Sequence, residues 1–350
     1  MFETFGFESL TAPQAAIWLG AALGLAFGVL AQITRFCLRS ALVGEPGARG
    51  PAAGVWLTAL ATAVIGTQVA VGTGWIGFGD HRFLASGMPI LALLAGGAMF
   101  GAGMVLTRGC ASRLTVLLGS GNLRALTVLL VFAIAAHATL KGVLAPLRTT
   151  LGSVTLPLGE TTSLAALPGG GVLWAGLIAV AALAIALRSG ARPPHLILAA
   201  LLGLLVPLGW AGTGHVLYDD FDPIAMQSLS FTLPFADTLF WGVAATSIPA
   251  TFGVGLIGGT VLGALVSALV RREFRWQSFE SPAQTGRYLT GGALMGVGGV
   301  LAGGCTVGAG LSGIPTLGLA AILALLAIAA GALVTNLVVS GRALAAVPAE

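Results

Sequence analysis

Long, continuous apolar segments are the feature that most constrains how this chain folds. A membrane-spanning helix needs about 20 apolar residues. Only helices and closed barrels satisfy their backbone polar groups within lipid, and these runs lack the alternating pattern of barrel strands. The segments lie near residues 14–34, 53–76, 88–107, 123–146, 171–188, 194–210, 235–249, 250–270, 288–304 and 316–340. The sequence therefore predicts an all-α, polytopic membrane protein.

The composition argues against a soluble domain and against a nucleic-acid-binding protein. Only 8% of the residues are charged, whereas soluble domains contain about 25%. The formal net charge of +4 is small and the basic residues are dispersed, unlike the basic patch that binds nucleic acid. The segments 194–210, 235–249 and 288–304 are short for a full span. We expect about nine spans and a few short re-entrant half-helices in one transmembrane transport domain, residues 1–350.

The distribution of charge predicts an orientation. The connection over residues 271–287 contains four arginines, residues 188–192 contain two, and Arg342 lies near the C-terminus. The loop over residues 214–228 contains three aspartates, Asp219, Asp220 and Asp222, and no Lys or Arg. Because basic loops stay cytoplasmic, we expect a multi-pass protein of the cell inner (plasma) membrane. Its C-terminus is then cytoplasmic and the 213–237 loop external.

The chain contains one glycine-rich segment twice. Residues 96–110 read GGAMFGAGMVLTRGC and residues 291–305 read GGALMGVGGVLAGGC, with nine of fifteen positions identical and no gap. Internal duplication is typical of transporters, whose substrate site lies near the membrane midplane where the repeats meet. We therefore expect an internal repeat with halves of roughly 14–146 and 235–340.

Both copies end in Gly-Cys and are followed by a break. After Cys110 and after Cys305, a short apolar stretch leads into Gly-Ser-Gly-Asn or Ser-Gly-Ile-Pro. Such half-helices are tolerated at depth only where protein or a cavity covers the broken backbone, and their N-termini favour an anion. The preceding glycines, Gly109 and Gly304, are expected to allow the turn. Cys37 ends the first apolar segment in a similar way, although the later segment that loosely matches it has no cysteine.

Other interpretations of these residues stay open. A free cysteine is often a small buried apolar residue and nothing more. Three cysteines in apolar segments do not suggest a disulfide framework, and three thiolates without a fourth ligand or a histidine are a weak metal site. We therefore expect no metal and no cofactor. The nearby Arg35, Arg39, Arg108 and Arg113 either extend to the membrane surface or attract an anion.

The three motifs RFCLRSAL, LTRGCASRLTVLLGSGN and GGCTVGAGLSG resemble the cysteine motifs of the YeeE/YedE family of sulfur-transport membrane proteins, over about residues 18 to 340. The resemblance implies an hourglass-shaped helical protein with short inward-pointing helices and three central cysteines, here Cys37, Cys110 and Cys305. It implies uptake of thiosulfate or a related sulfur anion. Some relatives carry a fused cytoplasmic sulfur-carrier domain; since this chain ends at Glu350, we expect any such carrier to be a separate protein.

The chemistry of thiosulfate suits this motif set. The ion is a dianion with a soft terminal sulfur, and a neutral thiol is a weak donor and a polarizable partner for it. Several weak sites let an ion both enter and leave. We expect a transporter or channel embedded in membrane lipid, and not an enzyme. The expected substrate-binding residues are Cys37, Cys110, Cys305, Arg108, Gly109 and Gly304.

Two alternatives remain at this point. The motifs do not separate thiosulfate from sulfide, sulfite, a persulfide or a selenium species. A membrane thiol enzyme that relays sulfur as covalent persulfides needs an activated thiolate beside a base or a cation. Arg108 lies two residues before Cys110, but no histidine lies near any of the motifs.

Overall fold

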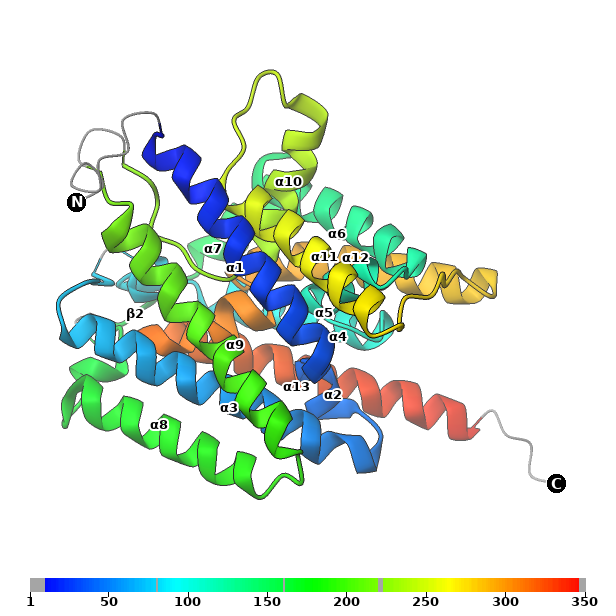
Figure 1. Ribbon diagram of the computed structural model, residues 1–350, viewed down its shortest axis with the longest axis horizontal. Coiled ribbons are helices and arrows are strands. Elements are labelled where there is room, and N and C mark those ends of the chain that lie inside the picture. Colours follow the sequence, from blue (N-terminus) through cyan, green and yellow to red (C-terminus); the bar gives the residue numbers. More distant parts are fainter. Residues whose placement is uncertain (1–9, 80, 160, 220–222, 346–350) are drawn as a thin grey trace.

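The computed structural model describes residues 10–79, 81–159, 161–219 and 223–345, with side chains described to residue 340. It is a bundle of helices (Figure 1). Within these residues, nine helical segments are long and apolar enough to cross a membrane. The predicted all-α, polytopic fold with about nine spans is therefore confirmed. Of the aspartates in the 213–237 loop, Asp220 and Asp222 lie outside the described residues.

Long helices make up most of the bundle. They are α1 (Ala12–Thr34), α3 (Pro46–Gly72), α4 (Ile90–Leu106), α6 (Leu123–Lys141), α8 (Gly170–Leu187), α9 (Pro193–Ala211), α11 (Phe252–Val270), α12 (Pro282–Leu301) and α13 (Leu319–Ala345). Shorter elements are α2 (Leu38–Val43), α5 (Ala111–Gly119), α7 (Ala145–Ser153), α10 (Thr232–Ala244), the π-helical turns η4 (Gly212–Val216) and η5 (Thr306–Leu311), the 3₁₀ turns η2 (Arg82–Leu84), η3 (Leu164–Ala166) and η6 (Ile314–Thr316), and the two-residue strands β1 (Gly87–Met88) and β2 (Leu156–Pro157). The apolar segment near 235–249 forms α10, which has 13 residues and is too short to span.

Several helices begin at residues that satisfy their free backbone N–H groups. Thr11 caps α1 in a reciprocal arrangement with Gln14. Asn122 caps α6, with its Oδ1 accepting from the Ala125 N–H at 3.1 Å. Ser281 caps α12 through the Gln284 N–H. Capping matters here because the first turn of each helix has donors with no partner inside the helix.

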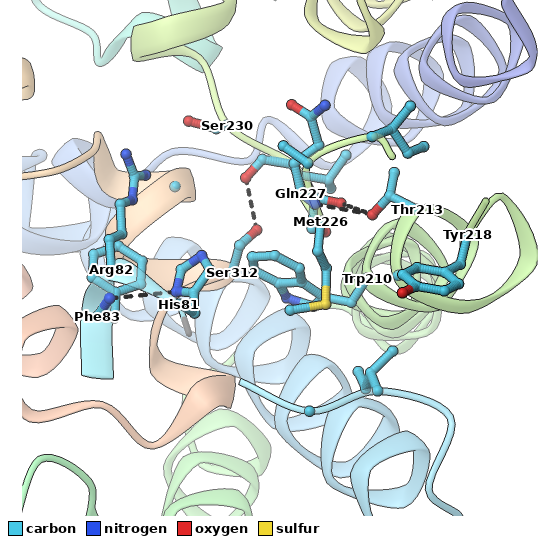
Figure 2. Close-up of a pocket in the computed structure, with 18 of the residues that line it drawn as sticks. His81, Arg82, Phe83, Trp210, Thr213, Tyr218, Met226, Gln227, Ser230 and Ser312 are labelled. Carbon is cyan, nitrogen blue, oxygen red and sulfur yellow. Dashed lines mark hydrogen bonds between the residues drawn. The ribbon is translucent and has the colours of Figure 1, made fainter. Parts of the chain in front are cut away.

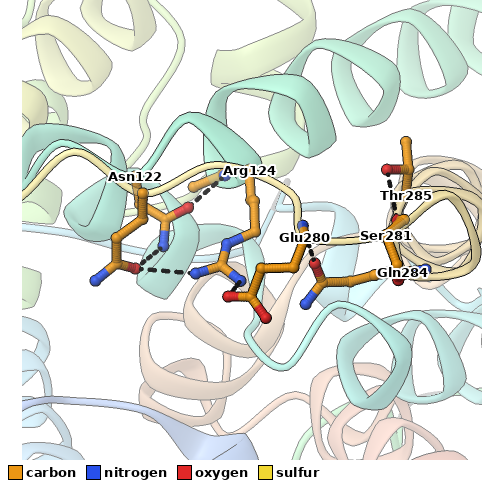
Figure 3. A network of polar contacts seen from close by, with 8 residues as sticks. Asn122, Arg124, Glu280, Ser281, Gln284 and Thr285 are labelled. Carbon is orange, nitrogen blue, oxygen red and sulfur yellow. Dashed lines mark hydrogen bonds and ion pairs between the residues drawn. The ribbon is translucent and has the colours of Figure 1, made fainter.

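Polar contacts join two connections at one end of the bundle (Figure 3). The Asn122 side-chain amide donates to Gln277 Oε1 at 2.8 Å, and Arg124 pairs with Glu280 at 3.5 Å. The start of α6 therefore lies beside the arginine-rich connection between α11 and α12. The 213–237 loop lies beside the start of α11, where Pro234 meets Gly253. Because α11 crosses the bundle, this loop lies at the opposite end from the arginine-rich connection. The two oppositely charged connections are thus separated, while the side of the membrane that each faces stays a prediction.

Close backbone contact between α1 and α11 forms one core of the bundle. Glycines recur every four residues on both facing surfaces: Gly20, Gly24 and Gly28 on α1, and Gly255, Gly259 and Gly263 on α11. A Cβ at any of these glycines would overlap a carbonyl oxygen of the other helix. In lipid, where apolar surfaces gain little by meeting each other, such close approach and the dispersion contacts it allows drive helix association.

The duplicated segments pack against each other in the same way. On α4 and α12, Gly96 faces Gly298 and Gly103 faces Gly291, each too close for a side chain between them. The two sequence copies are related by a shift of 195 residues, under which Gly96 corresponds to Gly291 and Gly103 corresponds to Gly298. Exchanging the two copies therefore converts the first of these contacts into the second. The helices α4 and α12 therefore meet through a reciprocal interface.

The α1–α11 contact predicts contrasting effects at two adjacent glycines. Replacing Gly259 with Leu should prevent the close approach of the helices, because its Cβ overlaps the Ala21 carbonyl oxygen. Replacing Gly258, whose Cβ would meet nothing within 4 Å, should be tolerated. We expect the yield of monodisperse protein in detergent to fall several-fold for Gly259→Leu only. Equal yields of the two variants would contradict this packing.

Candidate functional site

Each cysteine follows the same kind of turn at the end of a helix. The residue two positions before the cysteine is in the left-handed region, with φ of 54° at Arg35, 58° at Arg108 and 70° at Gly303. The cysteine itself has an extended backbone and directly precedes α2, α5 or η5. The chain thus breaks after Cys110 and Cys305 as expected from the sequence, and a free set of backbone N–H groups begins next to each thiol.

The turn before Cys110 differs in detail from the expectation. Its left-handed residue is Arg108 rather than Gly109, and a Cβ at Gly109 would be 3.4 Å from the nearest atom, which is ordinary contact. The Thr107 hydroxyl stabilises the turn, within hydrogen-bonding distance of the carbonyl oxygens of Gly103 (2.9 Å) and Gly109 (2.8 Å). Gly304 is more constrained, because a Cβ there would be 2.8 Å from the Ala309 nitrogen.

The thiols of Cys37 and Cys110 are close enough to interact with each other. The Cys110 sulfur is also 3.3 Å from Ser112 Oγ and reaches the hydroxyl of Thr306. Cys305, the residue before Thr306, accepts a hydrogen bond from the Gly308 N–H at 3.4 Å. All three cysteines are free thiols with side chains at most 3% exposed. The short segments after the helix breaks therefore bring the three cysteine motifs to one buried region.

A cavity of about 650 Å³ opens at the end of the bundle that contains the 213–237 loop (Figure 2). Gly308 and Ser312, which follow Cys305 in the chain, line its inner wall, and Arg82 lines its side. Arg82 also borders a smaller cavity of about 80 Å³ together with Gly303 and Gly304. Arg82 therefore lines both cavities and lies near the turn that precedes Cys305.

His81 and Arg82 are neighbours in this cavity but differ in charge. Burial, and next the positive charge of Arg82, lower the pKa of His81 to about 4. Its Nδ1 accepts a weak hydrogen bond from the Phe83 N–H at 3.4 Å, and its ring meets that of Trp210 edge to face at 5.2 Å between centroids. The Arg82 side chain is exposed and stays charged at neutral pH, because the ordinary pKa of arginine lies far above that range. At neutral pH the cavity thus contains a neutral imidazole and a guanidinium.

A second cavity, of about 380 Å³, opens at the opposite end. Arg35, Arg113, Arg272 and Arg275 line it, with Glu273 as its one carboxylate among the described residues. Arg113 interacts electrostatically with both Cys37 and Cys110. The cysteine region therefore lies between the cavity with Arg82 and the cavity with four arginines. We call them the outer and the inner cavity, after the orientation that the charge rule predicts.

The residues expected from the sequence do not all meet at this region. The three cysteines are brought together, and Gly304 borders the small cavity beside Arg82. Gly109 is buried in the turn before Cys110, whereas Arg108 is exposed and lines none of the three cavities. Within the described part of the chain, no cluster of three or more His, Cys, Asp or Glu residues is arranged to hold a metal ion.

Sequence reasoning missed Arg82, which belongs to no cysteine motif and lies outside the repeated segments 96–110 and 291–305. One signal was present in the sequence. The positive-inside rule predicts few basic residues at the external end of the bundle. Arg82 is a basic residue in a connection at that end.

In chemical terms, cations stand at both cavities and polarizable thiols lie between them. An anion that enters such a region exchanges its water for guanidinium groups, backbone N–H groups and thiols. An ion with one soft end and one hard, charged end suits both kinds of partner.

Comparison with known proteins identifies the family of this chain. Residues 33–334 match the model of a protein family described as sulphur transport. Thiosulfate transporter TsuA of Spirochaeta thermophila is 28% identical over 327 residues, which cover 88% of this chain and 94% of that protein. Thiosulfate transporter TsuA of Escherichia coli is 28% identical over 251 residues, which cover 65% of this chain and 68% of that protein. Since the family model spans most of the chain, including all three cysteine motifs, this protein belongs to the YeeE/YedE family of sulfur-transport membrane proteins.

Proposed function

We propose that this protein takes up thiosulfate across the cell inner membrane, through a path that passes Cys305, Cys110 and Cys37 in that order. The observation that carries the proposal is the buried group of thiols between two arginine-containing cavities. The choice of thiosulfate among sulfur species rests on the names of the two relatives. The orientation of the path in the membrane follows from the charge rule, which assigns the arginine-rich end and the C-terminus to the cytoplasm.

Each part of the path has a distinct physical task. Arg82 attracts the dianion into the outer cavity and offsets part of its lost hydration. In the buried region, thiols contact the soft sulfur without adding negative charge, and the amides at the start of α5 face the anion's oxygens. The contacts are individually weak and sequential, which permits release as well as entry. No covalent step is required.

Symmetry supports the same path. We take the chain as one transport domain whose repeat halves are roughly 14–146 and 235–340. The reciprocal α4–α12 contacts support this division, since the same 195-residue shift relates Cys110 to Cys305. On the cytoplasmic side, a separate sulfur-carrier protein is the natural acceptor of the ion where the path ends.

Substitution of Cys110 tests the role of the thiols. In cells that lack their own importers, uptake of labelled thiosulfate should fall at least tenfold for Cys110→Ala, because the soft contact is lost while the turn keeps its Thr107 hydrogen bonds. Cys110→Ser keeps a donor without the polarizable sulfur and should recover only part of the rate. Full-rate uptake by a well-expressed Cys110→Ala protein would remove the thiols from the mechanism. Sulfite release in proportion to uptake would instead identify the persulfide-forming enzyme.

Substitution of Arg82 tests the outer cavity. Arg82→Gln should raise the KM for thiosulfate roughly tenfold, the factor that about 1.4 kcal/mol of lost interaction gives. Arg82→Lys should recover part of this effect, because it restores the charge without the planar fork. Lys141→Gln is a matched control, since Lys141 is exposed at the same end and lines none of the cavities. An equal rise in KM for the control would show a general surface-charge effect.

The neutral state of His81 predicts how uptake depends on pH. A histidine whose pKa is lowered to about 4 gains its proton only as the pH falls through that value. Between pH 5 and 8 His81 therefore adds no change of charge to the outer cavity. We expect His81→Gln to leave the shape of the uptake profile unchanged over this range. An inflection near pH 6.5 that disappears in the variant would contradict the assignment.

A further inference from the structure

The end of α11 repeats the turn that precedes each cysteine, but its chemistry differs. Arg272 has a φ of 56°, close to the 54° of Arg35 and the 58° of Arg108. A cysteine lies two residues after Arg35, Arg108 and Gly303, whereas the residue two positions after Arg272 is Phe274. The residue between them is Glu273, and it lines the inner cavity. The fourth turn therefore contributes a carboxylate to the path instead of a thiol.

Glu273 is held by contacts from two directions. Its Oε1 accepts from Arg271 Nη2 at 3.1 Å, and its Oε2 accepts from Gln32 Nε2 at 3.2 Å. Gln32 is buried on α1, and its Oε1 accepts from Ser120 Oγ at 3.1 Å at the end of α5. Chiefly through the hydrogen bond from Arg271, the pKa of the Glu273 carboxyl lies below its ordinary value. An ionised carboxylate thus stands where α1, α5 and α11 meet.

The same cavity has more positive charge than this carboxylate balances. Four arginines line it, and Glu273 interacts electrostatically with Arg35 as well as with Arg113. The Arg113 Nη1 is buried and has no hydrogen-bond partner among the described residues. A buried donor of a charged group without a partner is costly, and an anion bound in the cavity would satisfy it.

We infer that the inner cavity is a binding site for a divalent oxyanion, in which Glu273 is the resident negative charge that limits how tightly the anion is held. When the site is empty, the carboxylate partly neutralises the arginines. When a dianion leaves Cys37, Arg113 and Arg272 receive it while Glu273 repels it. The site therefore binds the ion strongly enough to draw it inward and weakly enough to release it. That this ion is on its way to the cytoplasm rests on the proposed function; the anion site itself does not.

Binding of labelled sulfate to purified protein in nanodiscs tests the inference. Sulfate has the divalent charge of thiosulfate without its soft sulfur, so it reports on the arginines and not on transport of a particular sulfur species. The measurement uses the full chain with Arg82→Gln, which weakens the outer cavity. In this background we expect Glu273→Gln to tighten sulfate binding about tenfold and Arg113→Gln to weaken it by at least the same factor.

Glu280→Gln is the matched control. Glu280 belongs to the same connection and pairs with Arg124 at 3.5 Å (Figure 3), but it does not line the inner cavity. It should leave the affinity for sulfate unchanged. If Glu273→Gln binds sulfate no more tightly than its parent, or if Glu280→Gln tightens binding equally, the inference is overturned.

The outcome is separable from that of the proposed function. If cells show no thiosulfate uptake while Glu273→Gln still tightens sulfate binding, the transport substrate is wrong and the inner site stands. If uptake is robust but sulfate affinity does not respond to Glu273, the transporter stands and the inner site fails. Where both hold, Glu273→Gln should also lower the maximal rate of uptake severalfold, because release becomes slower.

Discussion

Backbone contact between glycine-faced helices is the constraint on which the rest of the structure depends. In lipid, an apolar side chain gains little by leaving one apolar surrounding for another, so helices associate where they fit closely. The α1–α11 and α4–α12 pairs are close enough that no Cβ fits between them at several positions. Each of these four helices ends in a left-handed turn, and three of the turns lead into a cysteine. The paired helices therefore set where the turns, and with them the thiols, are placed.

The polar groups of the proposed path are divided according to the free-energy cost of burying them. Charged side chains gather in the two cavities at the ends, where solvent reaches them, while the buried region between is lined by thiols and hydroxyls. Burying a full charge in a medium of low dielectric is expensive unless it is paired. Arg113 is the exception, since it reaches from the inner cavity toward Cys37 and Cys110. The buried Nη1 of Arg113 has no hydrogen-bond acceptor among the described residues. The proposed transported anion would supply that acceptor.

Much of the fold and part of the site were predictable from the sequence. The helical membrane class follows from the apolar segments, and the breaks after Cys110 and Cys305 follow from the glycines and short stretches around them. Arg108 shows the limit of the approach. It is two residues from Cys110 in the chain, yet its side chain is exposed and lines none of the three cavities. Arg82, far from any motif, instead lines a cavity together with Gly308 and Ser312, which follow Cys305 in the chain.

The sequence by itself determined the features that depend on local composition: the membrane-spanning helices, the duplicated glycine-rich segment, the breaks at the cysteines and the separation of basic from acidic connections. Only the tertiary structure decided which charges meet which thiols. Arg82, Arg113 and Glu273 come from three different connections or short helices, and their place on the path depends on how the helices pair across more than a hundred residues of chain. Such pairing arises from the fit of one helix surface to another, and a single sequence without its partner surface does not reveal it.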